Sequence, residues 1–369
     1  MAAYLNKNDF EATYYYTGKA HSGREDFLRE HGVRIIQIRA EGISASGKWI
    51  NTDIFECFDE GNYDIIQTAI AGQREWPYYL IKKPVVQFVA YDSGVDFSSN
   101  VYHSFISSQW WRERWISLGG SRRFSSVAIA GIEEPVETQG IRESLGIPKD
   151  ALVAGFHQRA DDNIFSPMPL NAFAAIAPDN SWFLILGGSR QYSEQAARLG
   201  IKNFLQLPHT AERKIISSFL NTLDIFAHGR KDGETFGYVF AEALMHKLPC
   251  LGHAARGNAH RDTMGPGGLW AENEKEYAQQ LKLLFTNPDL RHRLSMLGEH
   301  FASENYDDAK AMSQIEHIYH TIYKRDIAYI FTLYVSVYLR KFLNMFRIGI
   351  FCYKKIVLRF ISLLKMIKP

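Results

Sequence analysis

The chain has 369 residues, of which 46% are hydrophobic and 22% are charged, and its formal net charge is +2. This length allows two domains with separate cores, and this composition excludes a disordered chain. Three widely spaced cysteines give no indication of a disulfide framework or a metal cluster, and the N-terminus lacks the apolar core of a signal peptide. Both features favour a cytoplasmic setting.

The N-terminal half alternates short apolar runs with polar loops, which predicts a Rossmann-like domain over residues 1–138. A glycine-containing loop at 18–23 follows the first run, at the strand end where open α/β sheets place ligands. An ordinary polar turn fits this loop equally well. Near-continuous apolar runs are typical of a parallel sheet buried on both faces. We expect strands at 13–17, 33–38, 64–70, 84–89 and 126–130, a helix at 24–31, and partly helical structure at 74–83.

Two stretches of this half look like functional motifs but favour plainer interpretations. Gly42–Lys48 matches a phosphate-binding loop, yet Trp49 stands where serine or threonine must bind magnesium, so we expect a turn. Trp111 and Trp115 lie in the aromatic-rich stretch 102–118 and are spaced i, i+4. This spacing indicates one helix face packed in the core rather than a platform for a ligand.

A polar stretch at 133–140 contains Pro135 and lacks apolar anchors, as is typical of a linker. We therefore place the domain boundary near residue 138. The alternation of strands and helices then resumes, which predicts a second Rossmann-like domain over 139–323. Its strands are expected at 151–156, 181–188, 204–208, 225–227 and 250–251, and its last helices at 274–285, 288–299 and 308–323.

Residues 225–251 predict a strand, a loop, a helix and a strand, with Glu234 before the helix or at its start and Glu242 about two turns into it. Eight helical residues span roughly 12 Å, which suits two carboxylates that bind sugars at the two ends of one extended ligand. The helix start offers free N–H groups to a diphosphate between those sugars. For two glutamates taken alone, a charge that complements the helix dipole and a solvated surface charge are the simpler interpretation.

The residues around the two glutamates form a longer pattern, Glu-x-Phe-Gly-x-x-x-x-Glu-Ala-Leu followed by Leu-Pro. Here it reads Glu234, Phe236, Gly237, Glu242, Ala243, Leu244, Leu248 and Pro249. This pattern resembles the signature of family-4 glycosyltransferases (glycosyl transferases group 1), which are retaining enzymes of GT-B fold. The resemblance implies that Glu234 holds the transferred sugar and that Glu242 holds the ribose of the nucleotide.

The resemblance also implies a clamp on the donor diphosphate. Family members end the first strand of the second domain with an arginine and place a lysine a few residues later; here Arg159 comes two or three positions late, and no lysine follows before Asn171. Arg159 can bind phosphate through two parallel hydrogen bonds, or it can pair with Asp161 or Asp162 on the surface. Gly257 and Asn258 match a turn that reaches the diphosphate in family members. Arg256 stands where that turn is expected to have one of its two glycines, so it adds a positive charge there.

Other positions take weaker assignments from the same resemblance. Leu207 and Pro208 fall in the loop against which the nucleotide base lies in family members. Gly18 is assigned to the donor phosphates and His21 to the acceptor side. Thr68-Ala69 and Ala71-Gly72 stand where members often carry a histidine-glycine pair, so a catalytic histidine in the first domain is in doubt. Arg230 and Lys231 either face a phosphate or are solvated, and solvation is favoured.

The C-terminal tail, residues 324–369, has ten Lys or Arg residues against one acidic residue. Its uncharged stretch, 327–339, would span roughly 20 Å as a helix, which is too short to cross a bilayer. At helical spacing, residues 340–369 separate into an apolar side and a basic side, the pattern of an interfacial helix on an anionic membrane. A helix that dimerises or binds a partner is the alternative; nucleic acid is disfavoured because phosphates need no deep apolar face.

These observations predict an α/β chain of two Rossmann-like domains (GT-B) with a C-terminal amphipathic helical tail. The predicted activity is transfer of a sugar, with retention, from a nucleotide-diphosphate sugar to a glycan or lipid-linked acceptor at the inner face of the membrane, in surface polysaccharide synthesis. No Asp-x-Asp occurs, so we expect no metal, and no cofactor beyond the donor. A non-catalytic nucleotide-sugar-binding or scaffold protein and a GT-B-fold epimerase remain alternatives.

Overall fold

The computed structural model describes residues 1–20, 23–45, 47–70, 74, 76–89, 94–129, 132, 134–324, 335 and 339. The described residues form two compact units. Unit 1 comprises Met1–Ile106, Arg112–Ala128 and the residues from Met312 on, and unit 2 comprises Ser107–Trp111 and Ile129–Ala311. The boundary expected near residue 138 stays a prediction, and the predicted tail, 324–369, lies almost entirely outside the described residues.

Unit 1 contains a parallel sheet in the order β3-β4-β5-β6 and a separate parallel pair, β1-β2. All of β4 except Phe88 is buried, as its near-continuous apolar sequence predicts for a strand covered on both faces. The strands are β1 (Thr13–Thr17), β2 (Arg34–Ile38), β3 (Ile66–Ile70), β4 (Val85–Val89), β5 (Val101–Ile106) and β6 (Ser125–Val127).

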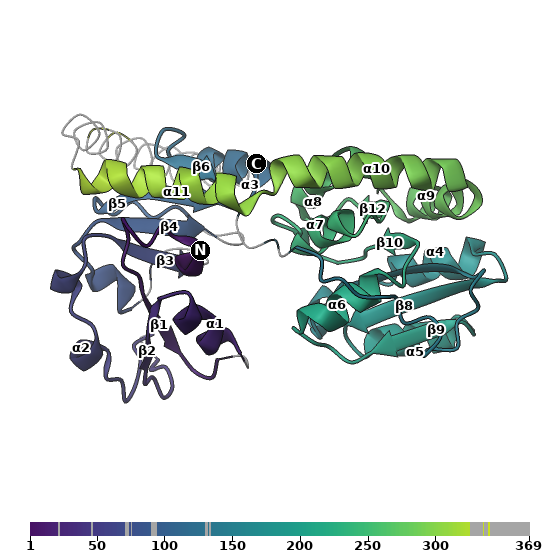
Figure 1. Ribbon diagram of the computed structural model, residues 1–369, viewed down its shortest axis with the longest axis horizontal. Coiled ribbons are helices and arrows are strands. Elements are labelled where there is room, and N and C mark those ends of the chain that lie inside the picture. Colours follow the sequence, from purple (N-terminus) through teal and green to yellow (C-terminus); the bar gives the residue numbers. More distant parts are fainter. Residues whose placement is uncertain are drawn as a thin grey trace, which may run out of the picture. The chain divides into compact units, whose positions relative to one another are not determined.

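The helices of this part are short (Figure 1). They are α1 (Arg24–Glu30), α2 (Ile54–Cys57) and α3 (Gln109–Ser117), with 3-10 turns at Ala2–Tyr4, Glu60–Asn62 and Tyr78–Leu80. The partly helical structure expected at 74–83 is therefore, among its described residues, the single 3-10 turn at Tyr78–Leu80. Trp111 and Trp115 of α3 are 2% and 3% exposed, which confirms that they pack in the core.

The segment that matches a phosphate-binding loop is a turn. Ile43 and Trp49 form an isolated antiparallel bridge, and the Gly47 N–H donates to the Ser44 carbonyl at 2.9 Å. The next helix, α2, begins only at Ile54. A phosphate-binding loop leads directly into a helix, so the structure supports the plainer interpretation.

Unit 1 also receives the last described helix, α11 (Asp308–Tyr323), from Met312 on. The Asn6 N–H donates to Glu316 Oε1 at 2.7 Å, and the rings of Phe10 and Tyr319 pack edge to face with centroids 5.8 Å apart. The Tyr319 hydroxyl donates to Gln67 Oε1. The chain therefore ends its described part against the unit in which it began.

Unit 2 is organised around a six-stranded parallel sheet in the order β14-β12-β10-β7-β8-β9. Counted along the chain from β7, this is the order 3-2-1-4-5-6 of dinucleotide-binding folds, and its direction reverses between β7 and β10. Open sheets of this kind bind ligands outside the carboxyl ends of the strands at that reversal. The strands are β7 (Leu152–Gln158), β8 (Ser181–Gly187), β9 (Phe204–Leu207), β10 (Ile225–Ala227), β12 (Cys250–His253) and β14 (Gly268–Ala271).

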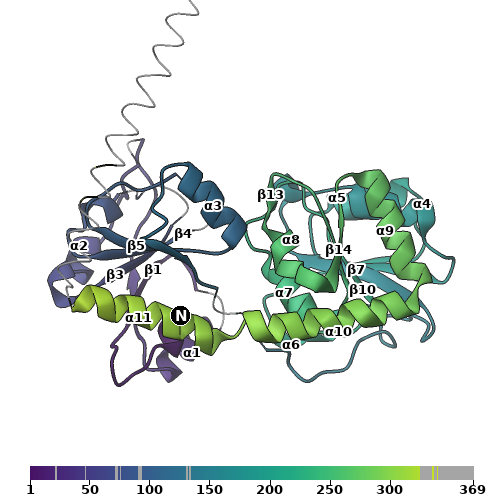
Figure 2. The same ribbon diagram turned by 90° about the horizontal axis from the view of Figure 1, so that it is seen from above.

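Figure 2 shows the helices of unit 2 around this sheet. They are α4 (Met168–Ile176), α5 (Gln191–Arg198), α6 (Arg213–Leu220), α7 (Tyr238–Met245), α8 (Ala259–Met264), α9 (Glu274–Thr286) and α10 (Pro288–Asn305), with 3-10 turns at Asp162–Ile164 and Gly265–Gly267. A two-stranded parallel ladder, β11 (Gly233–Glu234) with β13 (Gly257–Asn258), lies outside the main sheet. The strands predicted for this domain are confirmed, and so are the helices predicted at 274–285, 288–299 and 308–323, with ends that shift by a few residues; from Met312 on, the last of these helices belongs to unit 1.

The core of unit 2 is one continuous apolar cluster. Strands β7, β8 and β10 are almost completely buried, because a parallel sheet with helices on both faces leaves no strand face to water. Asparagine side chains cap two helices: Asn273 Oδ1 accepts the Glu276 N–H at the start of α9, and Asn287 Oδ1 accepts the Leu290 N–H at the start of α10.

Candidate active site

The candidate site lies in unit 2 at the carboxyl ends of β7 and β10. These strands are adjacent and parallel, with Ile225 opposite Ala154, so the residues that follow them meet at one edge of the sheet. His157 and Gln158 end β7, and Arg159 follows them. His228 follows β10, and the chain continues through Arg230 to Glu234.

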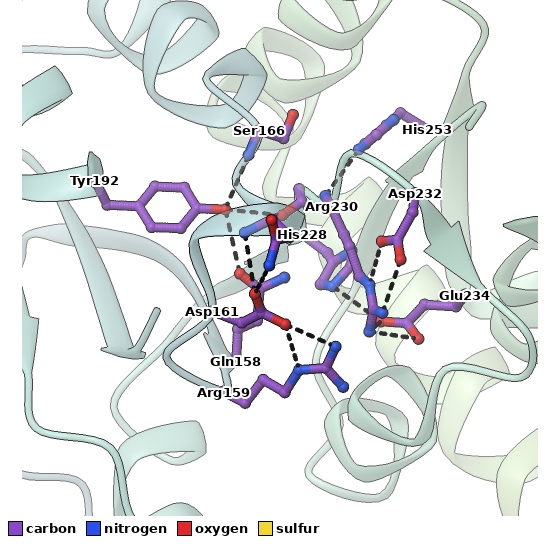
Figure 3. A network of polar contacts seen from close by, with 12 residues as sticks. Gln158, Arg159, Asp161, Ser166, Tyr192, His228, Arg230, Asp232, Glu234 and His253 are labelled. Carbon is purple, nitrogen blue, oxygen red and sulfur yellow. Dashed lines mark hydrogen bonds and ion pairs between the residues drawn. The ribbon is translucent and has the colours of Figure 1, made fainter. Parts of the chain in front are cut away.

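A charged network surrounds Glu234 (Figure 3). Arg230 Nη1 donates to both oxygens of the Glu234 carboxylate at 3.2 Å. The same guanidinium donates from Nε and Nη2 to the two oxygens of Asp232, at 2.6 and 3.1 Å. Its side chain is only 8% exposed. Arg230 was expected to be solvated; that expectation is wrong, because the chain folds its guanidinium between two carboxylates.

A tight turn brings Arg230 back alongside Glu234. The Gly233 N–H donates to the Arg230 carbonyl at 3.2 Å, which closes the turn over Lys231 and Asp232. Gly233 has φ +71°, and a Cβ there would lie 1.9 Å from the Gly257 carbonyl oxygen. Glycine is therefore required twice over, for the backbone conformation and for the close approach of β11 to β13.

Glu234 is a partly desolvated carboxylate. Its side chain is 15% exposed, and burial raises its pKa, while the charge and hydrogen bonds of Arg230 act in the opposite direction. His228 Nε2 lies 3.6 Å from Glu234 Oε1. Burial, and after it the charges of nearby histidines and of Arg230, hold the pKa of His228 well below its usual value, so its imidazole is neutral. Within the described residues neither ring nitrogen of His228 has a hydrogen-bond partner.

Glu242 lies on α7, beyond a sharp entry into that helix. Glu234 belongs to β11 and α7 begins at Tyr238, so the two glutamates are not joined by eight helical residues, and the helical estimate of about 12 Å between them does not apply. Gly237 stands at the N-cap with φ +96°. Glu242 Oε2 lies 2.9 Å from His157 Nε2 at the end of β7, a partner that the sequence did not single out.

Arg159 is held by a neighbouring carboxylate. Its Nε and Nη2 donate to Asp161 Oδ2 at 3.1 and 2.9 Å, and its side chain is 48% exposed. This is the surface pairing that was the alternative to a phosphate clamp. Its positive charge nevertheless acts, with that of Arg230, against the burial that raises the pKa of Glu234.

The predicted diphosphate turn adjoins Glu234. Gly257 and Asn258 form β13, in register with Gly233 and Glu234 of β11. Asn258 Oδ1 accepts the Ala255 N–H at 2.8 Å, and Arg256 is exposed. The structure therefore brings this turn and the first glutamate together.

The remaining predicted residues are distributed differently. The Phe236 ring is 3% exposed and packs edge to face on Tyr238 and Tyr306, so its side chain is part of the core. Leu207 ends β9, and Pro208 after it is exposed. Gly18 lies in unit 1, where its carbonyl accepts the Gln37 side-chain amide at 2.7 Å. His21 lies outside the described residues.

Among the residues that the structure describes, no group of three or more His, Cys, Asp or Glu side chains is arranged to hold a metal ion. Within the same part of the chain, no helix combines the length and the apolarity that crossing a membrane requires.

The fold is that of known glycosyltransferases. Anabaena Alr3699/HepE, solved in complex with UDP and glucose, superposes with a TM-score of 0.63 at 16% identity over 83% of this chain and 91% of that one. A glycosyltransferase from Rickettsia africae ESF-5 gives 0.68 at 13% identity over 87% and 92%. WaaG, a glycosyltransferase involved in lipopolysaccharide biosynthesis, gives 0.57 at 15% identity over 84% and 90%. No curated protein matches the chain in sequence.

Two α/β units and a Rossmann-type sheet, together with these neighbours, define a chain of GT-B fold. Residues 137–300 match the family of glycosyl transferases group 1, and this match includes β7, β10 and the candidate site. The chain therefore carries a glycosyl transferases group 1 domain over these residues.

Proposed function

We propose that this glycosyltransferase uses a nucleotide-diphosphate sugar as its donor and transfers the sugar with retention of configuration. The observation that carries the proposal is the charged network of Glu234 at the reversal point of the unit 2 sheet, where folds of this topology bind nucleotides. The complexes of Anabaena HepE with UDP and with UDP-glucose support a uridine nucleotide as the first donor to examine.

The two glutamates, Arg159 and the Gly257-Asn258 turn have separate roles in this proposal. Glu234 accepts hydrogen bonds from hydroxyl groups of the transferred sugar and stabilises the positive charge that develops on the sugar ring. Glu242 accepts a hydrogen bond from a hydroxyl group of the ribose. The bond between the anomeric carbon and the diphosphate oxygen breaks, and its electron pair leaves with the diphosphate. Arg159, the Gly257-Asn258 turn and the positive end of the α7 helix dipole stabilise that leaving group without a metal or a further cofactor. An acceptor hydroxyl forms the new bond and releases its proton.

The acceptor is proposed to be a glycan or a lipid-linked glycan at the inner face of the cell membrane, in surface polysaccharide synthesis. Support comes from the basic and apolar residues of 324–369, which suit an anionic membrane surface. Gly18 and His21 of the N-terminal loop are proposed to lie on the donor-phosphate and acceptor sides.

The test is incubation of the full chain with labelled UDP-, GDP-, ADP- and dTDP-sugars, followed by separation of free sugar, epimer and transfer product. A product, from slow hydrolysis or from transfer, that has the same anomeric configuration as the donor supports the proposal. An inverted product would exclude retention, an epimerised donor would identify an epimerase, and binding without turnover would identify a non-catalytic protein. Arg256→Ala adds a local test: unchanged donor affinity would exclude a contribution of Arg256 to the diphosphate site.

A further inference from the structure

We infer that Arg230 is the positioning residue of the donor site: its guanidinium fixes the orientation of the Glu234 carboxylate and places a positive charge against it. This inference rests on the proposed role of Glu234. Arg230 lies within the network of Figure 3, and no feature of the sequence signature assigns it a part in the reaction.

The geometry requires a planar, forked donor. One guanidinium satisfies two carboxylates at once, with Nε and Nη2 on Asp232 and Nη1 on Glu234. An ammonium group is a compact point charge and cannot reproduce these directions. Because Asp232 holds two of its N–H groups, the plane of the guanidinium is fixed, and its Nη1 holds both oxygens of the Glu234 carboxylate in one orientation.

The position of Arg230 is itself fixed from the backbone. Its N–H donates to His253 Nε2 at 3.2 Å, and His253 Nδ1 lies 2.9 Å from the Ala254 carbonyl, to which it donates. The preceding carbonyl, that of Gly229, accepts the buried Tyr192 hydroxyl at 3.1 Å. Both bonds are made by the peptide unit before the Arg230 Cα, and on the other side of that Cα the Arg230 carbonyl accepts the Gly233 N–H at 3.2 Å. The loop that carries Arg230 is thus anchored on both sides of its Cα, which is what a residue that orients another side chain needs.

The surroundings of Glu234 explain why a cation is needed. The neutral His228 imidazole lies on one side at 3.6 Å and is packed against the rings of Phe226 and Phe240. Asp232 contributes a second negative charge, and the more distant Arg159 a positive one. Burial and the charge of Asp232 raise the pKa of Glu234, and the charge and hydrogen bonds of Arg230 act against that rise.

The experiment compares Arg230→Lys and Arg230→Gln with the unaltered full chain. The control is Arg142→Lys: Arg142 Nη2 pairs with Asp224 at 2.8 Å, and Asp224 directly precedes β10, at the end of the strand opposite His228. Donor turnover is followed from pH 5 to 9 with the nucleotide sugar found active in the donor panel. Affinity for the matching nucleoside diphosphate, which lacks the sugar, is measured in parallel.

We expect Arg230→Lys to lower kcat/KM about tenfold or more near pH 6.5, and Arg230→Gln to lower it further. The acid limb of the pH profile should move upward by about one to three pH units in Arg230→Gln, because a carboxylate loses that much stabilisation without its arginine. Affinity for the nucleoside diphosphate should stay within about twofold, since Glu234 contacts the sugar and not the diphosphate. Arg142→Lys should leave the pH profile unchanged.

Two results would overturn the inference. One is a pH profile and kcat/KM of Arg230→Lys equal to those of the unaltered chain; the other is a loss of nucleoside diphosphate affinity as large as the loss of kcat/KM. The variant Glu234→Gln distinguishes a failure of the role of Glu234 from a failure of the role of Arg230. If Glu234→Gln keeps full turnover, the proposed function of Glu234 fails; if it loses turnover while Arg230→Lys does not, only the role of Arg230 fails. If Arg230→Gln does not fold, the same measurements are made on Arg230→Lys and on Asp232→Asn, which removes the carboxylate charge that holds the Arg230 guanidinium.

Discussion

The Glu242 carboxylate on α7 and the His157 imidazole at the end of β7 face each other, with Oε2 and Nε2 2.9 Å apart. Neither atom has a hydrogen-bond partner of good geometry in the described structure, and the side chains are 25% and 12% exposed. A carboxylate oxygen with unused acceptor capacity, fixed by its own helix and by the neighbouring strand, is suited to accept a hydroxyl of a bound ribose.

From this pair we predict that Glu242→Gln weakens nucleoside diphosphate binding about tenfold or more, because a hydrogen bond to a charged group contributes about 1.5–3 kcal/mol. Titration calorimetry with the nucleotide alone measures this. Glu299→Gln, which removes a carboxylate paired with Lys247 on the surface, is the matched control and should bind normally. Equal affinities of the Glu242 variant and the control would exclude the ribose role.

Replacement of Glu234 should act on turnover. We expect Glu234→Gln to reduce kcat by about two to three orders of magnitude, the usual loss when one preorganised group that stabilises transition-state charge is removed. Steady-state kinetics with the active donor check this, with nucleotide affinity as a measure of the intact fold. A kcat within threefold of the unaltered chain would contradict the assignment.

The close approach of β11 and β13 makes a prediction about Gly233. Gly233→Ala should destabilise unit 2 by more than about 1 kcal/mol, because the new Cβ would lie 1.9 Å from the Gly257 carbonyl oxygen. Gly200→Ala is the control: its φ is +67°, close to the +71° of Gly233, but nothing lies within 4 Å of its Cβ position. The difference between the two variants in urea denaturation isolates the contact; if the two variants unfold alike, the contact contributes nothing.

Buried histidines make stability depend on pH. Burial lowers the pKa of His103 and of His260 to about 3, against an ordinary value of 6.5. Between pH 6.5 and pH 3 these histidines are protonated in the unfolded chain but not in the folded chain. The free energy of unfolding therefore decreases as the pH falls below about 6.5. Each such histidine should cost about 1.4 kcal/mol per pH unit in that window.

Denaturant unfolding at pH 7.5 and pH 5.5 measures this loss. His260 Nε2 hydrogen-bonds to the His253 carbonyl at 2.9 Å, which an amide nitrogen can also reach, so His260→Gln is a suitable variant. It should flatten the pH dependence by the contribution of one proton. A pH slope that His260→Gln leaves unaltered would show that His260 is not among the groups responsible.

The basic tail, 324–369, predicts binding to anionic membranes. Charge reversal at Lys354, Lys355 and Arg359 should abolish sedimentation with vesicles of phosphatidylglycerol and phosphatidylcholine, since each basic residue near such a surface adds about 1 kcal/mol. Binding of the unaltered chain should weaken with salt and be absent on pure phosphatidylcholine. Salt-independent binding to both vesicle types would point to apolar insertion alone.

The sequence determined the elements around the donor site, because local patterns encode them. Apolar runs of three to six residues flanked by polar or glycine-containing loops predicted β7, β8 and β10, and the glutamates, Gly237 and the Leu-Pro pair indicated the family that residues 137–300 match. Strand β5 was missed, because Val101–Ile106 runs into an aromatic-rich stretch whose spacing suits a helix.

The tertiary structure alone decided which side chains meet. Arg230 reads as a solvated charge in a polar loop, yet a turn closed by Gly233 buries it between Asp232 and Glu234. His157 carries no signal in the sequence, and it reaches Glu242 only because β7 packs against α7. Strand order places these groups together, and strand order depends on long-range pairing that no local pattern contains.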